Sequence, residues 1–120
     1  MTICADLRTV DFAPSTFDAV VSLYTFDHVP RAEHRELLGR AHRWLRPGGW
    51  FLLSIEDADE PGQTVEWLGV DMHFSMFDAA TTRRLVTDAG FLIERTAVET
   101  QLERATEIPY TWVLARKPER

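Results

Sequence analysis

Two histidines are the side chains best suited to proton transfer in this chain. His28 follows the apolar run of residues 18–24, and His73 lies in the aromatic-rich segment of residues 67–77. Imidazole titrates near neutral pH, so either ring could act as a catalytic base. Structural roles stay open for both. His28 could bind backbone groups and begin the next helix, and His73 could belong to a lid on the core.

Aromatic and thioether side chains surround His73 in the sequence. Trp67, Met72 and Phe74 occur there without a clear period. Pockets for small molecules are lined mainly by apolar and aromatic side chains, with a few polar groups among them. We therefore predict that these three residues help to bind a substrate. The alternative is that they only pack a lid against the core.

The sequence predicts no metal site. His34 and His42 are eight residues apart, whereas ligands on one helix face are three or four residues apart. The acidic run of residues 56–63 lacks the alternating ligands of a calcium-binding loop, and a solvated loop is the simpler interpretation. The common phosphate-loop and nucleophile-elbow motifs are also absent.

A strand–helix–strand unit is the clearest structural feature of the sequence. Residues 18–24 are apolar and β-branched, which is typical of a strand buried on both faces. Pro30 opens a helical pattern with one apolar stripe, and the helix should end at Arg46 because the next residue is proline. After a Gly–Gly turn, residues 50–55 form a second buried strand. Two such strands joined by one helix should be parallel, with a right-handed crossover.

The remaining elements complete an α/β pattern. They are a candidate strand at residues 2–4, a loop at 56–63, an irregular segment at 67–77, a helix at 79–89 capped by Asp78, and strands at 91–99 and 110–115. The last two strands have no helix between them, so they should form an antiparallel hairpin, reached through a long turn.

Length, composition and charge indicate one domain over residues 1–120. The hydrophobic fraction of 45% is sufficient for one core, and the net charge of −6 argues against nucleic acid as a partner. No apolar run approaches the roughly 18 residues that span a bilayer, and the N-terminus does not resemble a signal peptide. Cys4 is the single cysteine. We therefore expect a cytoplasmic domain without a membrane partner.

Four stretches of the chain resemble the class I S-adenosylmethionine-dependent methyltransferases, in their small-molecule branch. They are ADLRTVDFAPSTFDAVVSLYTFDHVP, LLGRAHRWLRPGGWFLLS, EWLGVDMHFSMFD and RRLVTDAGF. The resemblance implies a partial Rossmann-like fold, with a mostly parallel sheet and a C-terminal antiparallel hairpin. It also implies S-adenosylmethionine as cofactor and methyl transfer to a small-molecule acceptor.

The resemblance also implies roles for individual residues. Asp6 would accept a hydrogen bond from the adenine amino group, and Leu7 would offer its backbone N–H to the adenine ring. Ser22, Leu23 and Tyr24 would line the cofactor cleft at the end of their strand. A turn-capping role for Asp6 and a core position for Tyr24 are the alternatives.

The resemblance does not include the first two strands of the family fold or their glycine-rich turn, and no G-x-G occurs in the chain. Three explanations stay open: a fragment or mis-started chain, a complementing polypeptide, or self-association, as in a homodimer, that covers the lost sheet edge. The second interpretation of this chain is therefore a non-catalytic module that self-associates or binds a partner.

Overall fold

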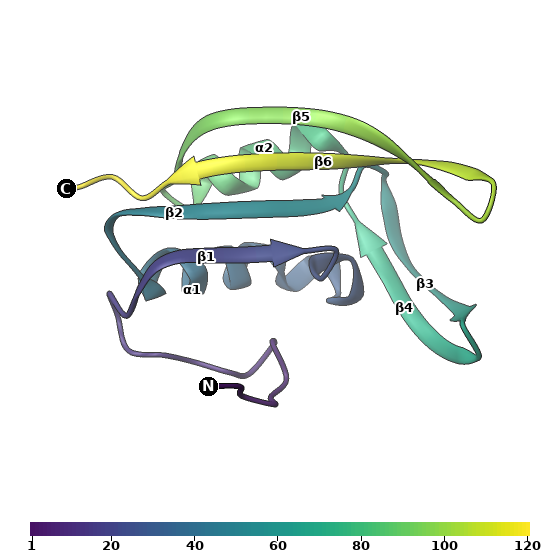
Figure 1. Ribbon diagram of the computed structural model, residues 1–120, viewed down its shortest axis with the longest axis horizontal. Coiled ribbons are helices and arrows are strands. Elements are labelled where there is room, and N and C mark those ends of the chain that lie inside the picture. The colour runs from purple at the N-terminus through teal and green to yellow at the C-terminus, as the bar shows by residue number, and fades with distance from the viewer.

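The main sheet of the computed structural model, which describes residues 1–120, contains four strands in the order β1–β2–β6–β5 (Figure 1). β1 (Phe17–Leu23) and β2 (Leu45–Glu56) are parallel, whereas β6 (Thr106–Arg116) is antiparallel to both β2 and β5 (Leu92–Glu103). The α/β class, the parallel pair and the C-terminal hairpin are confirmed. The sheet is mixed and not mostly parallel, because β6 returns from β5 without a helix and enters between β5 and β2.

The predicted strand–helix–strand unit connects β1 to β2. Two 3-10 turns, η1 (Phe26–His28) and η2 (Arg31–Glu33), lead from β1 into helix α1 (His34–Trp44). The helix begins later than predicted because Pro30 has an extended backbone and separates the two turns. It ends at Trp44, and Leu45 is already extended. This helical crossover lets the two strands pair as neighbours that run in the same direction.

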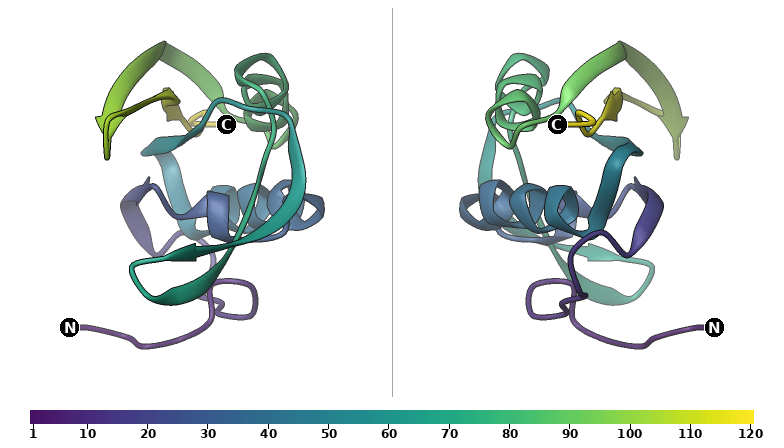
Figure 2. Two further views of the ribbon diagram at one scale, coloured as in Figure 1. Left: turned by 90° about the vertical axis from the view of Figure 1, so that its right-hand side faces the viewer. Right: turned by 90° about the vertical axis from the view of Figure 1, so that its left-hand side faces the viewer.

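Both helices cover the same face of the main sheet (Figure 2). The second helix, α2 (Ala79–Asp88), begins at the predicted cap, where Asp78 Oδ1 accepts a hydrogen bond from the Thr81 N–H at 2.7 Å. Neither helix is long and apolar enough to cross a membrane. The side chains buried between helices and sheet include Leu37, Leu38, Ala41, Trp44, Phe51, Leu53, Ile55, Val86, Phe91 and Val113.

The second face of the sheet lacks a covering layer. Val21 and Leu23 of β1 are 60% and 44% exposed, and Trp50 of β2 is 41% exposed. The prediction that residues 18–24 are buried on both faces is therefore wrong for this chain. The β-branched residues form the strand as expected, but only alternate side chains meet the helices.

A separate hairpin of β3 (Glu60–Trp67) and β4 (Val70–Met76) occupies the region predicted as a loop and an irregular segment. Its turn residues Leu68 and Gly69 have φ values of 50° and 85°. Positive φ at both positions matches the twist of a two-residue hairpin. Leucine is uncommon in that conformation, so the turn has no recognisable sequence signal.

The connection between β5 and β6 is also shorter than predicted. Arg104 and Ala105 form a two-residue turn with φ values of 47° and 63°, and neither is glycine. The strands therefore extend several residues beyond the predicted spans of 91–99 and 110–115. The candidate strand at residues 2–4 is not formed, since no neighbouring strand pairs with it.

His34 connects the turn after β1 to the start of α1 through hydrogen bonds of its side chain. Its side chain is buried, and its Nε2 lies 2.8 Å from the Phe26 carbonyl oxygen and 2.9 Å from that of Val29. The Nε2–H donates to these two backbone acceptors, which also accept the Val29 N–H and the Ser75 hydroxyl, respectively. Burial lowers the pKa of His34, so the ring stays neutral. His34 therefore determines where the intervening residues of η1 are held.

We expect His34→Ala to reduce the free energy of unfolding by about 2–4 kcal/mol, because it removes the buried hydrogen bonds from the ring to two carbonyls and creates a small cavity. Urea denaturation followed by circular dichroism measures this change. Glu36→Ala, at an exposed position of the same helix, is the matched control and should have little effect. Equal stability of the two variants would contradict the conclusion that the hydrogen bonds of His34 stabilise the turn after β1.

Candidate functional site

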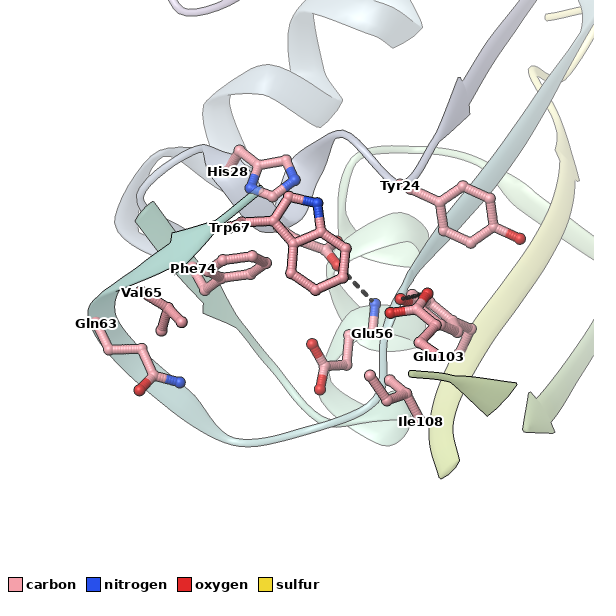
Figure 3. Close-up of a pocket in the computed structure, with 11 residues that line it drawn as sticks. Tyr24, His28, Glu56, Gln63, Val65, Trp67, Phe74, Glu103 and Ile108 are labelled. Carbon is pink, nitrogen blue, oxygen red and sulfur yellow. Dashed lines mark hydrogen bonds between the residues drawn. The ribbon is translucent and has the colours of Figure 1, made fainter. Parts of the chain in front are cut away.

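A cavity of about 420 Å³ lies beyond the C-terminal ends of β1 and β2, and is hereafter the main cavity. The residues after β1, the ends of β2 and β5, the start of β6 and the β3–β4 hairpin form its wall (Figure 3). In open α/β sheets, ligands bind at this edge, because the loops that follow parallel strands meet there. The main cavity is therefore the first candidate for a binding site.

The turn η1 contributes a buried carboxylate to the main cavity. Asp27 is only 4% exposed, and its Oδ2 accepts a hydrogen bond from the Glu56 backbone N–H at 3.3 Å. Its other oxygen, Oδ1, has no hydrogen-bond partner. Burial is the main cause that raises the pKa of Asp27 above its usual value. A buried carboxylate oxygen without a hydrogen-bond partner is uncommon in folded proteins and is often found at a functional site.

His28 contributes an imidazole to the same wall. Its Nδ1 lies 3.0 Å from the His73 backbone oxygen, which can only accept, so the Nδ1–H is the donor. A neutral ring then carries its lone pair on Nε2. The ring also meets Phe74 edge-on, with 4.8 Å between the ring centroids. His28 is thus oriented from both sides, and Nε2 is available as an acceptor or base.

The side chain of His73 does not belong to the wall of the main cavity. Its Nε2 lies 3.1 Å from the Ser75 hydroxyl, which itself donates to the Val29 carbonyl. His73 therefore reaches the site only through its backbone oxygen, which orients His28. Catalysis by His73 stays a prediction, and its location favours a positioning role.

The β3–β4 hairpin supplies the aromatic part of the wall. Trp67 and Phe74, both predicted to bind substrate, line the main cavity, together with Gln63 and Val65. Met72 is half-buried and pairs with Val65 in the hairpin, but it is not part of the wall. Trp67 and Phe74 lie on the hairpin side of the cavity in Figure 3. Strand alternation places the side chain of His73 on the opposite face from Met72 and Phe74, and of these last two only Phe74 reaches the cavity wall.

The ends of the main sheet supply two further carboxylates and a phenol. Glu56 and Glu103 line the main cavity, and Glu103 Oε1 accepts a hydrogen bond from the Tyr110 hydroxyl at 2.8 Å. Burial, followed by the nearby charges of Asp27 and Glu103, raises the pKa of Glu56. Burial and the bond to Glu103 raise the pKa of Tyr110, which stays protonated. The cavity is therefore acidic.

Sequence reasoning missed these acidic wall residues. It interpreted the acidic run of residues 56–63 as a solvated loop, in which the carboxylates of Asp57 and Asp59 have structural partners. Asp57 Oδ1 accepts the Ala79 N–H at the start of α2 at 2.6 Å, and Asp59 pairs with Arg31 at 2.6 Å. The position of Glu56 at the end of the second strand is the sequence feature that could have indicated a place at this edge of the sheet.

The predicted adenine-binding residues lie in the loop before β1. Asp6 is exposed, accepts the Arg8 backbone N–H at 2.9 Å and pairs with the Arg8 guanidinium, which lowers the pKa of Asp6. The Leu7 N–H donates no hydrogen bond within the chain, while Arg40 holds the Leu7 carbonyl at 2.9 Å. An ionised carboxylate beside a free N–H is the donor–acceptor pair that an adenine edge requires.

The predicted cofactor cleft residues at the end of β1 occupy three different surroundings. Ser22 shares a cavity of about 150 Å³ with Leu7, and its hydroxyl is buried without a partner. Tyr24 lines the main cavity and meets Tyr110 edge-on at 4.9 Å between centroids. Leu23 is largely exposed. The three residues are therefore not equivalent, and their role in cofactor binding stays a prediction.

Comparison with known proteins places the chain in a family. The sequence model of a family described as "Methyltransferase domain" matches residues 4–96. The chain belongs to this methyltransferase family. It is 45% identical over 62 residues to the carboxy-S-adenosyl-L-methionine synthase of Geobacter metallireducens, a match over 51% of this chain and 25% of that protein. It is 30% identical over 93 residues to phosphoethanolamine N-methyltransferase 1 of Triticum aestivum, over 72% of this chain and 18% of that protein.

Solved methyltransferase structures share the fold. An S-adenosylmethionine-dependent methyltransferase of Methanosarcina mazei superposes with a TM-score of 0.80 at 19% identity, over 97% of this chain and 66% of that one. The 1,6-didemethyltoxoflavin-N1-methyltransferase of Burkholderia thailandensis, with bound 1,6-didemethyltoxoflavin and S-adenosylhomocysteine, gives 0.73 at 21% identity, over 97% and 50%. The cofactor implied by the sequence resemblance is thus the one named for solved members of the fold. The chain spans a quarter or less of the curated relatives and up to two thirds of these structures.

Asp27 should make the stability of this methyltransferase domain depend on pH. Because burial raises its pKa above 3.8, the folded state binds this proton more tightly than the unfolded state. The contribution of Asp27 is therefore present at low pH and is lost as pH rises above about 4. His28, Glu56 and Glu103 also face this carboxylate.

We expect the Asp27→Asn variant not to lose stability in this way. Its free energy of unfolding, relative to that of the wild type, should therefore increase from pH 4 to pH 7. The amide oxygen can still accept the Glu56 N–H. Urea denaturation at several pH values measures the difference, and Asp71→Asn, at an exposed position of β4, is the control. A pH-independent difference between Asp27→Asn and the wild type would contradict the prediction.

Proposed function

We propose that this chain takes part in methyl transfer from S-adenosylmethionine to a small-molecule acceptor. The observation that carries the proposal is the main cavity, which lies at the C-terminal ends of two parallel strands and is walled by His28, Trp67 and Phe74. Its size suits a small molecule. Family membership supplies the reaction class.

Different residues at this edge of the sheet would bind the cofactor and the acceptor. Asp6 and Leu7 would hold the adenine, and Tyr24 would separate the cofactor from the acceptor. Bound S-adenosylmethionine supplies an electrophilic methyl group, so the protein contributes mainly orientation and exclusion of water. The free Nε2 of His28 would accept a proton where the acceptor must lose one.

The relatives support a small-molecule acceptor. Phosphoethanolamine N-methyltransferase 1 and 1,6-didemethyltoxoflavin-N1-methyltransferase are named for acceptors of this size. The matched part of this chain includes the β3–β4 hairpin, whose aromatic side chains face the main cavity. The chain spans only part of the length of these relatives, so a complete methyl-transfer activity is proposed here and is not established by the matches.

Cofactor binding provides the direct test. Isothermal titration of the chain with S-adenosylhomocysteine should give measurable binding, and Asp6→Ala should weaken it about tenfold through the loss of one charged acceptor. Asp18→Ala is the matched control, because Asp18 is exposed at the opposite end of β1 and pairs only with Arg46. No heat with the wild-type chain would refute cofactor binding by this chain alone.

A non-catalytic, self-associating module is the second candidate. The specific observation is β1, which lies at the edge of the sheet with one unpaired side, while Val21, Leu23 and Trp50 are exposed on the uncovered face. An unpaired edge beside exposed apolar side chains is a surface that a second copy can cover.

This alternative predicts concentration-dependent dimers in sedimentation velocity. Val21→Lys should shift the equilibrium to monomer, because a charged side chain on the face cannot be buried in the dimer. Thr96→Lys, at an exposed position of β5, is the control. A monomer at every concentration would remove the alternative.

A further inference from the structure

We infer that the main cavity binds its ligand through a positively charged nitrogen, so that the methyl acceptor is a small amine and the product a methylated ammonium. The inference deepens the proposed function and depends on it for the identification of this ligand as the acceptor. It is carried by the free buried carboxylate oxygen of Asp27, by two further carboxylates in the wall, and by the aromatic rings opposite them.

Asp27 provides the most specific argument. Its side chain is almost fully buried, lines the main cavity, and has one oxygen without any hydrogen-bond partner. An unsatisfied buried acceptor is costly, and a charged one is more so. A positively charged ligand beside this side chain supplies the missing counter-charge.

The other carboxyl groups of the wall add negative charge near Asp27. Glu56 and Glu103 line the main cavity, and no lysine or arginine does. The Glu56 carboxylate makes no hydrogen bond within the chain, although Asp27 and Glu103 lie close enough to raise its pKa by repulsion. A cation among these groups relieves their repulsion, whereas an anionic or neutral acceptor leaves it in place.

The aromatic part of the wall also favours a cation. Trp67, Phe74 and Tyr24 line the main cavity, and the faces of such rings attract cations. Trp67 already binds one: the Arg104 guanidinium carbon lies 4.9 Å from its ring centre. The combination of carboxylates and aromatic faces recognises ammonium groups, including fully methylated ones that lack an N–H.

The transfer step balances with the groups present. The bound ammonium first gives one N–H proton to Nε2 of His28, which lines the main cavity and whose ring is oriented through Nδ1. The nitrogen lone pair then forms the new N–C bond, the sulfur–methyl bond breaks, and its electron pair stays on sulfur. The products are S-adenosylhomocysteine, a methylated ammonium and a protonated imidazole.

Two other cations are separated by the experiment. A divalent metal ion would need a tight ligand cluster, and no three carboxylate or imidazole groups of the chain are arranged to hold one. The sulfonium group of the methyl donor is the second source of positive charge, and competition between donor and probe distinguishes it from an acceptor ammonium.

The test titrates the full chain with choline and with its neutral carbon isostere 3,3-dimethylbutan-1-ol at constant ionic strength, followed by calorimetry and tryptophan fluorescence. We expect choline to bind at least about tenfold more tightly than the isostere. Glu56→Gln should reduce choline binding about tenfold. Glu94→Gln, an identical charge change on β5 outside the main cavity, should not.

Equal binding of choline and its isostere, or no response to choline, would overturn the inference. So would an equal response to magnesium chloride, or loss of choline binding when S-adenosylmethionine is added, since the site would then be a metal site or a sulfonium site. If Glu56→Gln does not fold, the comparison of choline with its isostere on the wild-type chain still decides. The separate titration with S-adenosylhomocysteine reports on the proposed function, so the two can fail independently.

Discussion

The parallel pairing of β1 with β2 is the constraint on which the site depends. In this register Leu23 lies opposite Ser54, and the Tyr24 N–H continues the pairing with the Ser54 carbonyl at 3.1 Å. Both strands therefore end at one edge, and the residues that follow them are brought together. Asp27 then reaches the Glu56 N–H across this edge. An antiparallel arrangement would place these groups at opposite ends of the sheet.

Two hairpins complete the main cavity, and both depend on tight turns. The β3–β4 hairpin brings Trp67 and Phe74 to one side, and the long β5–β6 hairpin brings Glu103 and Tyr110 to the other. The resulting space holds several carboxylates in partly desolvated surroundings. Such an arrangement costs stability in the free protein, and perturbed carboxylates of this kind are concentrated at functional sites. The acidity of the cavity is therefore better explained by a ligand than by folding.

The same sheet offers separate surfaces for the two proposed functions. Its helical face is filled by α1 and α2, whereas the opposite face and the outer edge of β1 are open. In solved methyltransferases of the same fold, the matched region is half to two thirds of the chain. The two proposed functions thus concern different surfaces of this molecule: methyl transfer would use the edge at the C-terminal ends of β1 and β2, and self-association would use the open face.

The sequence by itself determined the methyltransferase family, the strand–helix–strand unit, the capped helix α2 and the roles open to His28, Trp67 and Phe74, because local propensities and short motifs encode these features. Tertiary structure alone decided that Asp27 and Glu103 share one cavity, that Met72 and the His73 side chain lie outside its wall, and that β1 has an open face. The two hairpin turns were hidden because residues such as Leu68 and Arg104 adopt positive φ only when strand pairing imposes it. Long-range pairing sets which side chains meet, and no local pattern records it.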